Sequence, residues 1–380
     1  MKRYKQTLIF LIFGIMLMPF TNQCLNYIES VGLHGYFTNA EDTVFTWHGW
    51  FSESYQKKKG AYLNDHTGFR ADLVRLSGQI DFSIFKDVNY GGATTTRDGN
   101  IYYDDYLESY NGFDYVGHAA IVQYMAKLKA LQDTFSKLGK TFIFVYAPNK
   151  AYFYLERMPN KYRCYQPGPT NFADFLHTGD SLGINQIDFN DWLANKSGRT
   201  TDSIFTKQGI HWTIYGSLLA ADSLIRYLEC KRGVNLTHPK WTEVEHTDKG
   251  RFADNDMCDI VNLALPMTTE QFTYPKVVFK SDSTTKKPNI IILGDSFSET
   301  MLFNDVVPNV FNDWQIWVKM VGFHDKGGHP MSENTMNKID WKKEIDHTDC
   351  FVLLSTTTNL PKFGWGFIDQ AYAYYFPEKK

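Results

Sequence analysis

The stretch Asn289–Ser298, which reads NIIILGDSFS, decides the fold that this chain is expected to adopt. Its first half is a near-continuous aliphatic run, which is typical of a strand buried on both faces of a parallel sheet. Gly294 permits a sharp turn after that strand, and Ser296 follows where a helix is expected to start. Since active sites in such sheets lie beyond the carboxyl ends of the strands, the sequence predicts that Ser296 lies at the rim of one.

Strands and helices alternate along the chain from about residue 96. Further strands are expected at residues 141–146, 186–189, 314–318 and 350–355, and helices at residues 119–138 and 216–229. The helix at residues 119–138 is amphipathic, because its apolar residues recur at helical spacing. Buried strands separated by helices favour an α/β fold, in which helices cover both faces of a mainly parallel central sheet.

The first residues of the chain are typical of an export signal. Basic residues at positions 2, 3 and 5 precede the apolar, uncharged stretch Thr7–Phe20. That stretch fits the apolar region of a signal peptide better than a full membrane span, which needs about 20 residues. No small-x-small cleavage site follows it, so an uncleaved anchor is favoured over a cleaved signal peptide, with the rest of the chain outside the cytoplasm.

Three regions are therefore expected. Residues 1–24 form the signal anchor or signal peptide, residues 25–95 an accessory region packed on the main domain, and residues 96–380 the main α/β domain. A helix is predicted within the accessory region by the apolar residues Leu73, Leu76, Ile80 and Ile84, which recur at helical spacing.

The composition excludes several classes of function. The net charge is −3, so a nucleic-acid partner is not expected. The five cysteines show no C-x-x-C spacing, so a metal site is not expected, and no motif indicates a cofactor. The chain has 29 Phe and 23 Tyr residues, of which most are expected to fill the core and some to stack on the faces of sugar rings.

Ser296 needs a base, because a serine hydroxyl is a poor nucleophile until its proton is removed. The stretch QGIHWTIYG places His211 in an aromatic-flanked loop just before a helix. We interpret Ser296 as a nucleophile and His211 as its base. The developing oxyanion is expected to be supported by Gly294, Asp295 and Phe297. The structural alternatives stay open, because Asp295 and Ser296 also suit a helix cap and a lone histidine is often structural.

Four blocks, in this order, resemble the SGNH-like acetyltransferases of the AlgX/AlgJ group, which serve alginate and related exopolysaccharides. The early block of that group is similar to the stretch from Asn64–Arg70 through Arg97–Tyr103, and its strand with Pro-x-Lys is similar to Val145–Lys150. Its His-Trp-Thr block matches His211–Thr213, and its serine block matches Gly294–Ser298. Ordinary SGNH esterases have the serine first, whereas here the histidine block comes first, as in the AlgX/AlgJ group.

The resemblance implies an SGNH-like three-layer sandwich and an O-acetyltransferase that modifies an extracytoplasmic polysaccharide through an acyl-serine intermediate. It also implies a membrane-bound O-acyltransferase as the acetyl-donating partner, and a periplasmic location anchored to the inner membrane. Candidates for substrate binding are Asn149, Lys150, Trp212 and Tyr215, although Lys150 suits a solvated loop equally well. A carbohydrate esterase, and a non-catalytic glycan-binding scaffold in an exopolysaccharide assembly complex, stay as alternatives.

One position departs from the pattern of the group. An aspartate two residues before the histidine usually orients the imidazole and stabilises its cation, and this chain has Gly209 there. The site is then a Ser–His dyad, or a carboxylate from elsewhere replaces the missing one, or the chain is inactive and binds a glycan or a partner. The candidates for a replacement carboxylate are Asp188, Asp254 and Asp259.

Overall fold

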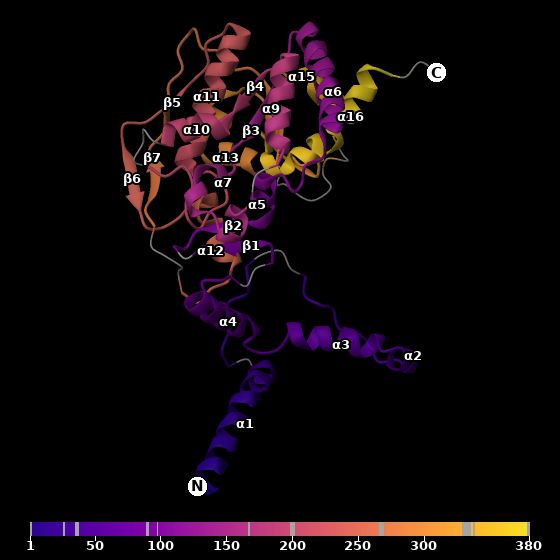
Figure 1. Cartoon of the computed structure of the whole chain (residues 1–380), viewed down its shortest axis with the longest axis vertical. Helices are drawn as coiled ribbons and strands as arrows, with labels where there is room; N and C mark the ends of the chain where they lie inside the picture. Colours follow the sequence, from indigo (N-terminus) through magenta and orange to yellow (C-terminus); the bar gives the residue numbers. More distant parts are fainter. Residues whose placement is uncertain are drawn as a thin grey trace. The chain divides into compact units, whose positions relative to one another are not determined.

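The computed structural model of the chain describes residues 2–25, 27–34, 38–88, 91–96, 98–165, 168–197, 202–265, 270–328, 336 and 339–377. They belong to two compact units (Figure 1). The first unit comprises Met1–Gly91 and Met257–Met267, and the second comprises Gly92–Asp256 and Thr268–Lys380. The division into residues 1–24, 25–95 and 96–380 stays a prediction.

The first unit is helical, with α1 (Lys2–Leu25), α2 (Trp47–Phe51), α3 (Ser54–Asp65) and α4 (Arg70–Phe85). Helix α1 is long and apolar enough over Arg3–Leu25 to cross a membrane, although a signal sequence has the same properties. Helix α4 contains the predicted apolar residues, and all of them are exposed: Leu73, Leu76, Ile80 and Ile84. The periodicity therefore predicted the helix correctly, while the buried residues of α4 are Gly78 and Phe82.

The second unit is built around a six-stranded sheet with the strand order β11-β10-β9-β12-β3-β4. Its strands are β3 (Thr141–Ala147), β4 (Gln186–Asp188), β9 (Ile290–Gly294), β10 (Trp314–Val318), β11 (Gly322–Asp325) and β12 (Cys350–Thr356). Every neighbouring pair is parallel except β10 and β11, which pair antiparallel at one edge. The five predicted strands are present, whereas β11 was not predicted, and the mainly parallel sheet confirms the expected fold class.

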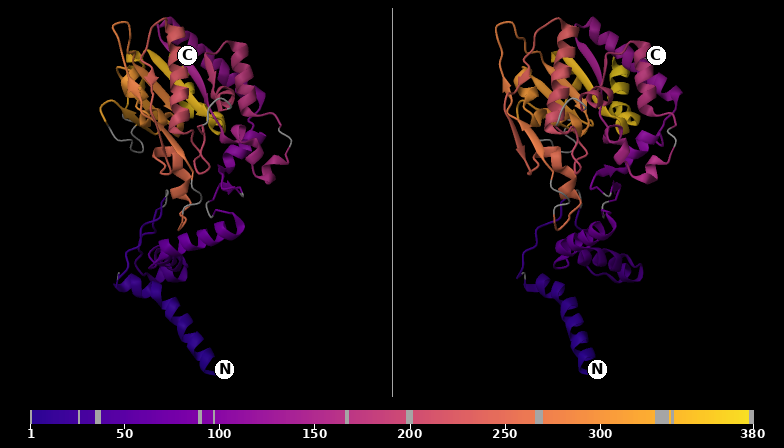
Figure 2. Two further views of the ribbon diagram at one scale, coloured as in Figure 1. Left: turned by 90° about the vertical axis from the view of Figure 1, so that its left-hand side faces the viewer. Right: turned by 60° about the vertical axis from the view of Figure 1, so that its left-hand side comes forward.

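Successive side chains of the buried strands pack into two separate cores, one on each face of the sheet. One core combines Ile143, Val145, Ile290, Ile292, Val352 and Leu354 with α10 (Phe189–Ser197), α11 (Ile214–Arg232), α13 (Thr300–Phe303) and α14 (Val306–Val310). The other combines Phe142, Phe144, Ile291, Leu293, Phe351 and Leu353 with α6 (His118–Lys137), α9 (Asn171–Leu182), α15 (Trp341–His347) and α16 (Phe367–Tyr375). Helices thus cover both faces (Figure 2), which confirms the three-layer architecture.

Shorter elements complete the second unit and its loops. Three two-stranded antiparallel sheets pair β1 (Ala93–Thr95) with β2 (Ile101–Tyr103), β5 (Pro239–Lys240) with β8 (Val278–Phe279), and β6 (Val244–Thr247) with β7 (Phe272–Pro275). The short helices of this unit are α5 (Asp104–Asn111), α7 (Lys150–Phe153) and α8 (Asn160–Arg163), whereas α12 (Asp256–Ile260) belongs to the first unit except for Asp256. The 3₁₀ segments are η1 (Leu155–Arg157), η2 (Phe252–Asn255), η3 (Ser296–Ser298) and η5 (Thr357–Gly366).

Candidate active site

The turn that follows β9 presents the serine. Asp295 accepts a hydrogen bond from the backbone N–H of Phe297 (3.2 Å) and so caps η3, which begins at Ser296. A Cβ at Gly294 would lie 3.0 Å from the carbonyl oxygen of Leu354, so a side chain here would crowd the backbone of β12. The φ of Gly294 is not positive. Space, rather than the turn conformation expected from the sequence, therefore explains this glycine.

Asp295 is buried and fastens the serine turn to the end of β12. Its Oδ2 accepts hydrogen bonds from the backbone N–H of Thr356 (2.9 Å), the hydroxyl of Thr356 (2.7 Å) and the side-chain amide of Asn359 (2.8 Å). Hydrogen bonds to a carboxylate are stronger than those between neutral groups, so these donors hold Asp295 in one orientation. Asp295 therefore holds the turn that carries Ser296 against the end of β12, and it has almost no exposed surface.

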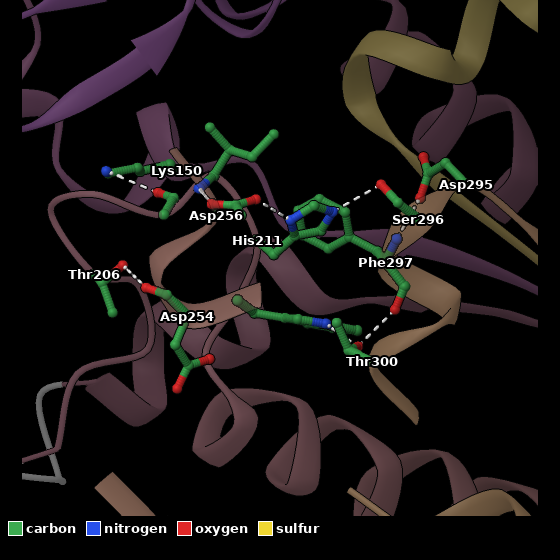
Figure 3. A network of polar contacts seen from close by, with 12 residues as sticks. Lys150, Thr206, His211, Asp254, Asp256, Asp295, Ser296, Phe297 and Thr300 are labelled. Atoms are coloured by element: carbon green, nitrogen blue, oxygen red, sulfur yellow. Dashed lines mark hydrogen bonds and ion pairs between the residues drawn. The ribbon is translucent and has the colours of Figure 1, made fainter. Parts of the chain in front are cut away.

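His211 reaches the serine from the loop that precedes α11. Its Nε2 lies 2.7 Å from the Oγ of Ser296, which joins segments 85 residues apart (Figure 3). This distance suits proton transfer from a hydroxyl to a base. The loop ends at Thr213, whose side chain accepts a hydrogen bond from the N–H of Gly216 (2.9 Å) and caps α11. Ser296 as a whole is partly exposed.

Asp256 supplies the carboxylate that the sequence left unassigned. Its Oδ2 lies 2.6 Å from Nδ1 of His211, and its Oδ1 accepts a hydrogen bond from the backbone N–H of Ile210 (3.1 Å). The aspartate thus holds both the imidazole and the backbone beside it. Figure 3 shows Asp256, His211 and Ser296 in a row, with the carboxylate and the hydroxyl on opposite sides of the ring.

The carboxylates proposed from the sequence do not take this position. Asp188 accepts a hydrogen bond from the backbone N–H of Asn190 (2.8 Å), and Asp254 accepts one from the N–H of Ile214 (2.9 Å). The side chain of Asp259 lies outside the described residues. The acid-rich stretch at residues 252–259 was a signal for the right segment, but spacing alone did not distinguish its aspartates.

Gly209 is explained by what packs against it. A Cβ at this position would lie 2.5 Å from Oγ1 of Thr206 and 3.0 Å from the carbonyl oxygen of Asp254. The hydroxyl of Thr206 donates a hydrogen bond to that same carbonyl (2.6 Å), so the two segments are held in direct contact. The space that a side chain at position 209 would fill is thus occupied by the hydroxyl of Thr206 and by the backbone of the segment that carries Asp256.

Replacing Gly209 with aspartate is therefore expected to damage the site rather than restore the usual pattern. Overpacking of this kind typically costs about 1–3 kcal/mol, and it would push the segment of Asp256 away from His211. Urea denaturation and turnover of a small acetyl ester measure the two effects. Gly168→Asp is the matched control, because a Cβ at Gly168 meets nothing within 4 Å. Wild-type stability and activity in Gly209→Asp would contradict this account.

Two opposing effects set the pKa of the His211 imidazole. Burial alone lowers the pKa of His211, but the adjacent Asp256 carboxylate, with smaller contributions from Asp295 and Glu299, raises this pKa above its ordinary value. The carboxylate therefore strengthens His211 as a base and stabilises the cation that forms when it accepts a proton.

Phe297 and Trp212 form the buried wall beside the imidazole. The centroid of the Phe297 ring lies 4.7 Å from that of His211 and 5.5 Å from that of Trp212. The indole N–H of Trp212 donates to the hydroxyl of Thr300 (2.6 Å), which donates in turn to the carbonyl of Phe297 (2.7 Å). Trp212 has no exposed surface. Its interpretation as a substrate-binding residue is therefore corrected to a packing role behind His211.

Lys150 lies inside the protein and not in a solvated loop. Its ammonium group donates to the carbonyl oxygens of Ile101 (2.9 Å), Lys207 (2.8 Å) and Gly209 (3.0 Å). These contacts use all three of its donors, and burial lowers the pKa of Lys150 to about 7. Lys150 thus ties β2 to the loop that leads to His211, and this supporting role replaces substrate binding.

Asn149 is also buried and supports its neighbours. Its side-chain amide donates to the carbonyl of Tyr106 (3.0 Å) and to the hydroxyl of Thr357 (2.9 Å), so it too is corrected to a supporting residue. Tyr215 is partly exposed, and its ring packs against Trp241 with a centroid distance of 6.3 Å. Its role in substrate binding stays a prediction.

The arrangement as a whole can activate a hydroxyl for attack on an acyl carbonyl. A partly exposed serine, a histidine and an aspartate are linked by two short contacts, which is the geometry of nucleophilic catalysis by serine. Within the described ranges, no group of three or more His, Cys, Asp or Glu side chains is arranged to hold a metal ion.

Several solved structures are similar to this chain. The O-acetyltransferase domain of Pseudomonas putida AlgJ is 14% identical over 74% of this chain and 99% of its own, with a TM-score of 0.48. Pseudomonas aeruginosa AlgX is 11% identical over 73% of this chain and 67% of its own, with a TM-score of 0.46. Bacillus cereus PatB1 is 11% identical over 64% of this chain and 91% of its own, with a TM-score of 0.39.

No curated protein matches the sequence. A family model does, and it spans residues 95–309, which include Lys150, His211, Asp256 and Ser296. The matched part is more than half of the 380-residue chain. The chain therefore belongs to the family described as "SGNH hydrolase-like domain, acetyltransferase AlgX".

Proposed function

We propose that the chain is an O-acetyltransferase that modifies a polysaccharide outside the cytoplasm, with Ser296 as nucleophile and His211 as base. Asp256 orients the imidazole. The observation that carries this proposal is the row of contacts from Asp256 through His211 to Ser296, at 2.6 and 2.7 Å. Membership of an acetyltransferase family supports the acetyl group as the one transferred.

In the first half of the reaction, Oγ of Ser296 attacks the carbonyl carbon of an acetyl donor, and its proton passes to Nε2 of His211. The imidazolium, stabilised by Asp256, then returns that proton to the departing oxygen of the donor, which leaves an acetyl ester on Ser296. We assign stabilisation of the oxyanion first to the backbone N–H of Ser296, because the N–H of Phe297 already bonds to Asp295.

In the second half, a sugar hydroxyl replaces the donor. His211 takes the hydroxyl proton as the sugar oxygen attacks the acetyl carbonyl, and Ser296 leaves with that proton. The products are an O-acetylated sugar and the free serine. Water in place of the sugar would release acetate, so the same side chains also permit ester hydrolysis.

One experiment tests both the intermediate and the acceptor. The full chain is incubated with a chromogenic acetyl ester, with and without oligosaccharides, and mass spectrometry follows Ser296 and the sugar products. We expect one acetyl group on Ser296 and acetylated oligosaccharide when sugar is present. Free acetate without acetylated sugar would identify an esterase instead, and turnover with no acetyl group passing through Ser296 would overturn the assigned mechanism.

The proposal includes a membrane-bound donor. Helix α1 is long and apolar enough to anchor the chain in the inner membrane, with the second unit on the periplasmic side. Acetyl groups made inside the cell must cross the bilayer, so we propose a membrane-bound O-acyltransferase as the partner that supplies them. Co-purification of such a protein with the full chain from detergent-solubilised membranes tests this partner, and its absence from the purified material would count against it.

The pH dependence of His211 gives a separate prediction. Because Asp256 raises the pKa of His211, we expect the imidazole to lose its proton at a pH above its ordinary pKa of 6.5. As the pH drops through this raised pKa, kcat/KM should fall. By linkage, the stability that this pair adds is complete below the unfolded-state pKa and is lost as the pH rises through the folded-state pKa. NMR titration of His211 in Ser296→Ala measures the value. The further change Asp256→Asn should lower it, and an unchanged value would contradict the assignment.

A further inference from the structure

A groove in the second unit lies on either side of Arg163. Two hollows, of about 480 and 430 Å³, share Glu156, Met158 and Arg163 in their walls, and we call them together the Arg163 groove. The first is lined further by Thr95, Thr96, Asp98, Arg157, Pro159 and Asn160. The second is lined further by Tyr110, Asn111, Leu155, Tyr162 and Tyr165. One half of the groove is therefore rich in polar groups and the other in tyrosine.

Aromatic rings are exposed at the edge of the second hollow. Tyr165 is 49% exposed, and its ring meets the exposed ring of Phe113 edge to face at 4.9 Å. The partly exposed ring of Tyr110 is supported in the same way by Tyr152, at 4.8 Å. Rings that are held in place by a second ring and still exposed on one side offer flat apolar faces, which suit the apolar faces of sugar rings.

Two guanidinium groups line the first hollow, and that of Arg163 also lines the second hollow, beside the tyrosines. Arg163 donates from Nη2 to the carbonyl of Met158 (3.1 Å) and to the side chain of Asn160 (2.9 Å). Its Nε and Nη1 groups make no hydrogen bond within the described part of the chain. Arg157 is stacked on the ring of Tyr154 at 4.7 Å, and about two fifths of its side chain is exposed. A guanidinium carries five N–H donors in a fixed plane, which suits hydroxyl pairs and carboxylates.

The groove is connected to the proposed active site by buried hydrogen bonds. Lys150 begins α7, which leads into the groove wall, and Lys150 donates to the carbonyl of Gly209 in the loop before His211. Asn149 donates to the carbonyl of Tyr106 in α5, the helix that also carries Tyr110. Asn149 and Lys150, two of the four residues expected to touch substrate, therefore link the elements of the groove wall to the loop before His211.

We propose that the Arg163 groove binds a segment of the carbohydrate acceptor. Tyr165 and Tyr110 stack on sugar rings, and Arg157 and Arg163 donate hydrogen bonds to sugar oxygens. The inference rests on the proposed function, because the bound segment belongs to the same chain whose hydroxyl meets the acetyl group on Ser296. Contacts away from the reacting hydroxyl explain how a long acceptor is selected over water, since remote binding energy contributes to orienting the reacting group.

The first test measures binding without turnover. The full chain with Ser296→Ala is titrated by calorimetry with two probes, a hexamer of a neutral hexose and a hexamer of a hexuronic acid. Binding of either hexamer that weakens about five- to tenfold in Tyr165→Ala supports the groove. Tyr165→Phe should bind within about twofold of its parent, because stacking needs the ring and not the hydroxyl. Failure of both hexamers to bind, or equal binding by Tyr165→Ala, would overturn the proposal.

A matched control separates the groove from general effects of losing a tyrosine. Tyr374, in α16, has the same exposure of 49%, but its ring packs on Trp341 of α15. Tyr374→Ala should bind the hexamers as tightly as its parent, and an equal loss in this variant would remove the support for the groove. Arg157→Ala should weaken binding about threefold or more, because it removes the hydrogen bonds that the guanidinium donates to sugar oxygens.

The second test keeps this inference distinct from the proposed function. Turnover of the chromogenic acetyl ester by the wild-type chain and by its Ser296→Ala variant needs no carbohydrate acceptor, so it tests the mechanism apart from the groove. Ester turnover that depends on Ser296, together with no hexamer binding, would overturn the groove and leave the acetyltransferase proposal standing. Hexamer binding that depends on Tyr165, together with ester turnover independent of Ser296, would leave the groove standing and overturn the mechanism.

Discussion

Replacing Ser296 with alanine is expected to lower kcat for acetyl transfer by about 10⁴-fold or more, while the protein stays folded. The substitution removes the oxygen that forms the acyl intermediate, and water held by His211 cannot take over covalent catalysis. Some acceleration over the uncatalysed reaction should persist, because the oxyanion donors and substrate binding act separately from the nucleophile. Initial rates with a chromogenic acetyl ester and with an oligosaccharide acceptor measure the loss.

Ser181→Ala is the control for this experiment. Ser181 is an exposed serine on α9 whose hydroxyl donates to the carbonyl of His177 (2.9 Å), away from the His211 loop. It should retain full activity. If Ser296→Ala retained more than about a tenth of wild-type turnover, with an unchanged melting temperature, the hydroxyl at position 296 would not be the nucleophile.

Replacing Asp256 with asparagine is expected to lower kcat by about 10³–10⁴-fold. The amide oxygen can still accept the hydrogen bond from Ile210, so the backbone should keep its place. The amide does not carry the negative charge that stabilises the imidazolium, and it favours the wrong tautomer of His211 when its N–H₂ faces Nδ1. A fall in kcat with a nearly unchanged KM identifies Asp256 as an orienting residue and not a binding one.

Asp254→Asn is the matched control, because it changes a neighbouring carboxylate in the same way. Burial raises the pKa of Asp254 to about 7, so the acid is partly protonated near neutral pH and an amide is a mild replacement. Its Oδ1 accepts from the N–H of Ile214, which an amide oxygen also does. We expect activity within about threefold of wild type. A loss in Asp254→Asn as large as that in Asp256→Asn would reject the distinction between the two.

Fold class and strand positions followed from local pattern. The aliphatic run Ile290–Leu293 and the runs in β3 and β12 are buried on both faces, so each predicted a strand without knowledge of its neighbours. Strand β11 is short and only partly buried, and it therefore carries no such signal. The apolar stripe of α4 predicted a helix correctly, but its exposure could not be derived from periodicity.

Within the site, the sequence indicated Ser296 and His211, because each sits in a motif with its own chemical logic. It did not indicate Asp256, which meets His211 across 45 residues from a segment containing several acids. The burial of Lys150 was not predictable from the sequence either, because a lysine after Pro-x also suits a solvated loop. Only the fold places three carbonyl oxygens around its ammonium group.

By itself the sequence determined which segments become strands, and it predicted Ser296, two residues after the end of β9, as the nucleophile and His211 as its base. These depend on hydrophobic pattern and residue type, which act locally along the chain. Only the tertiary structure showed which carboxylate orients the imidazole and why a side chain does not fit at position 209. It also showed which polar residues are buried and hold neighbouring segments in place. Those outcomes depend on packing between distant segments, where a shift of one side chain changes every available contact.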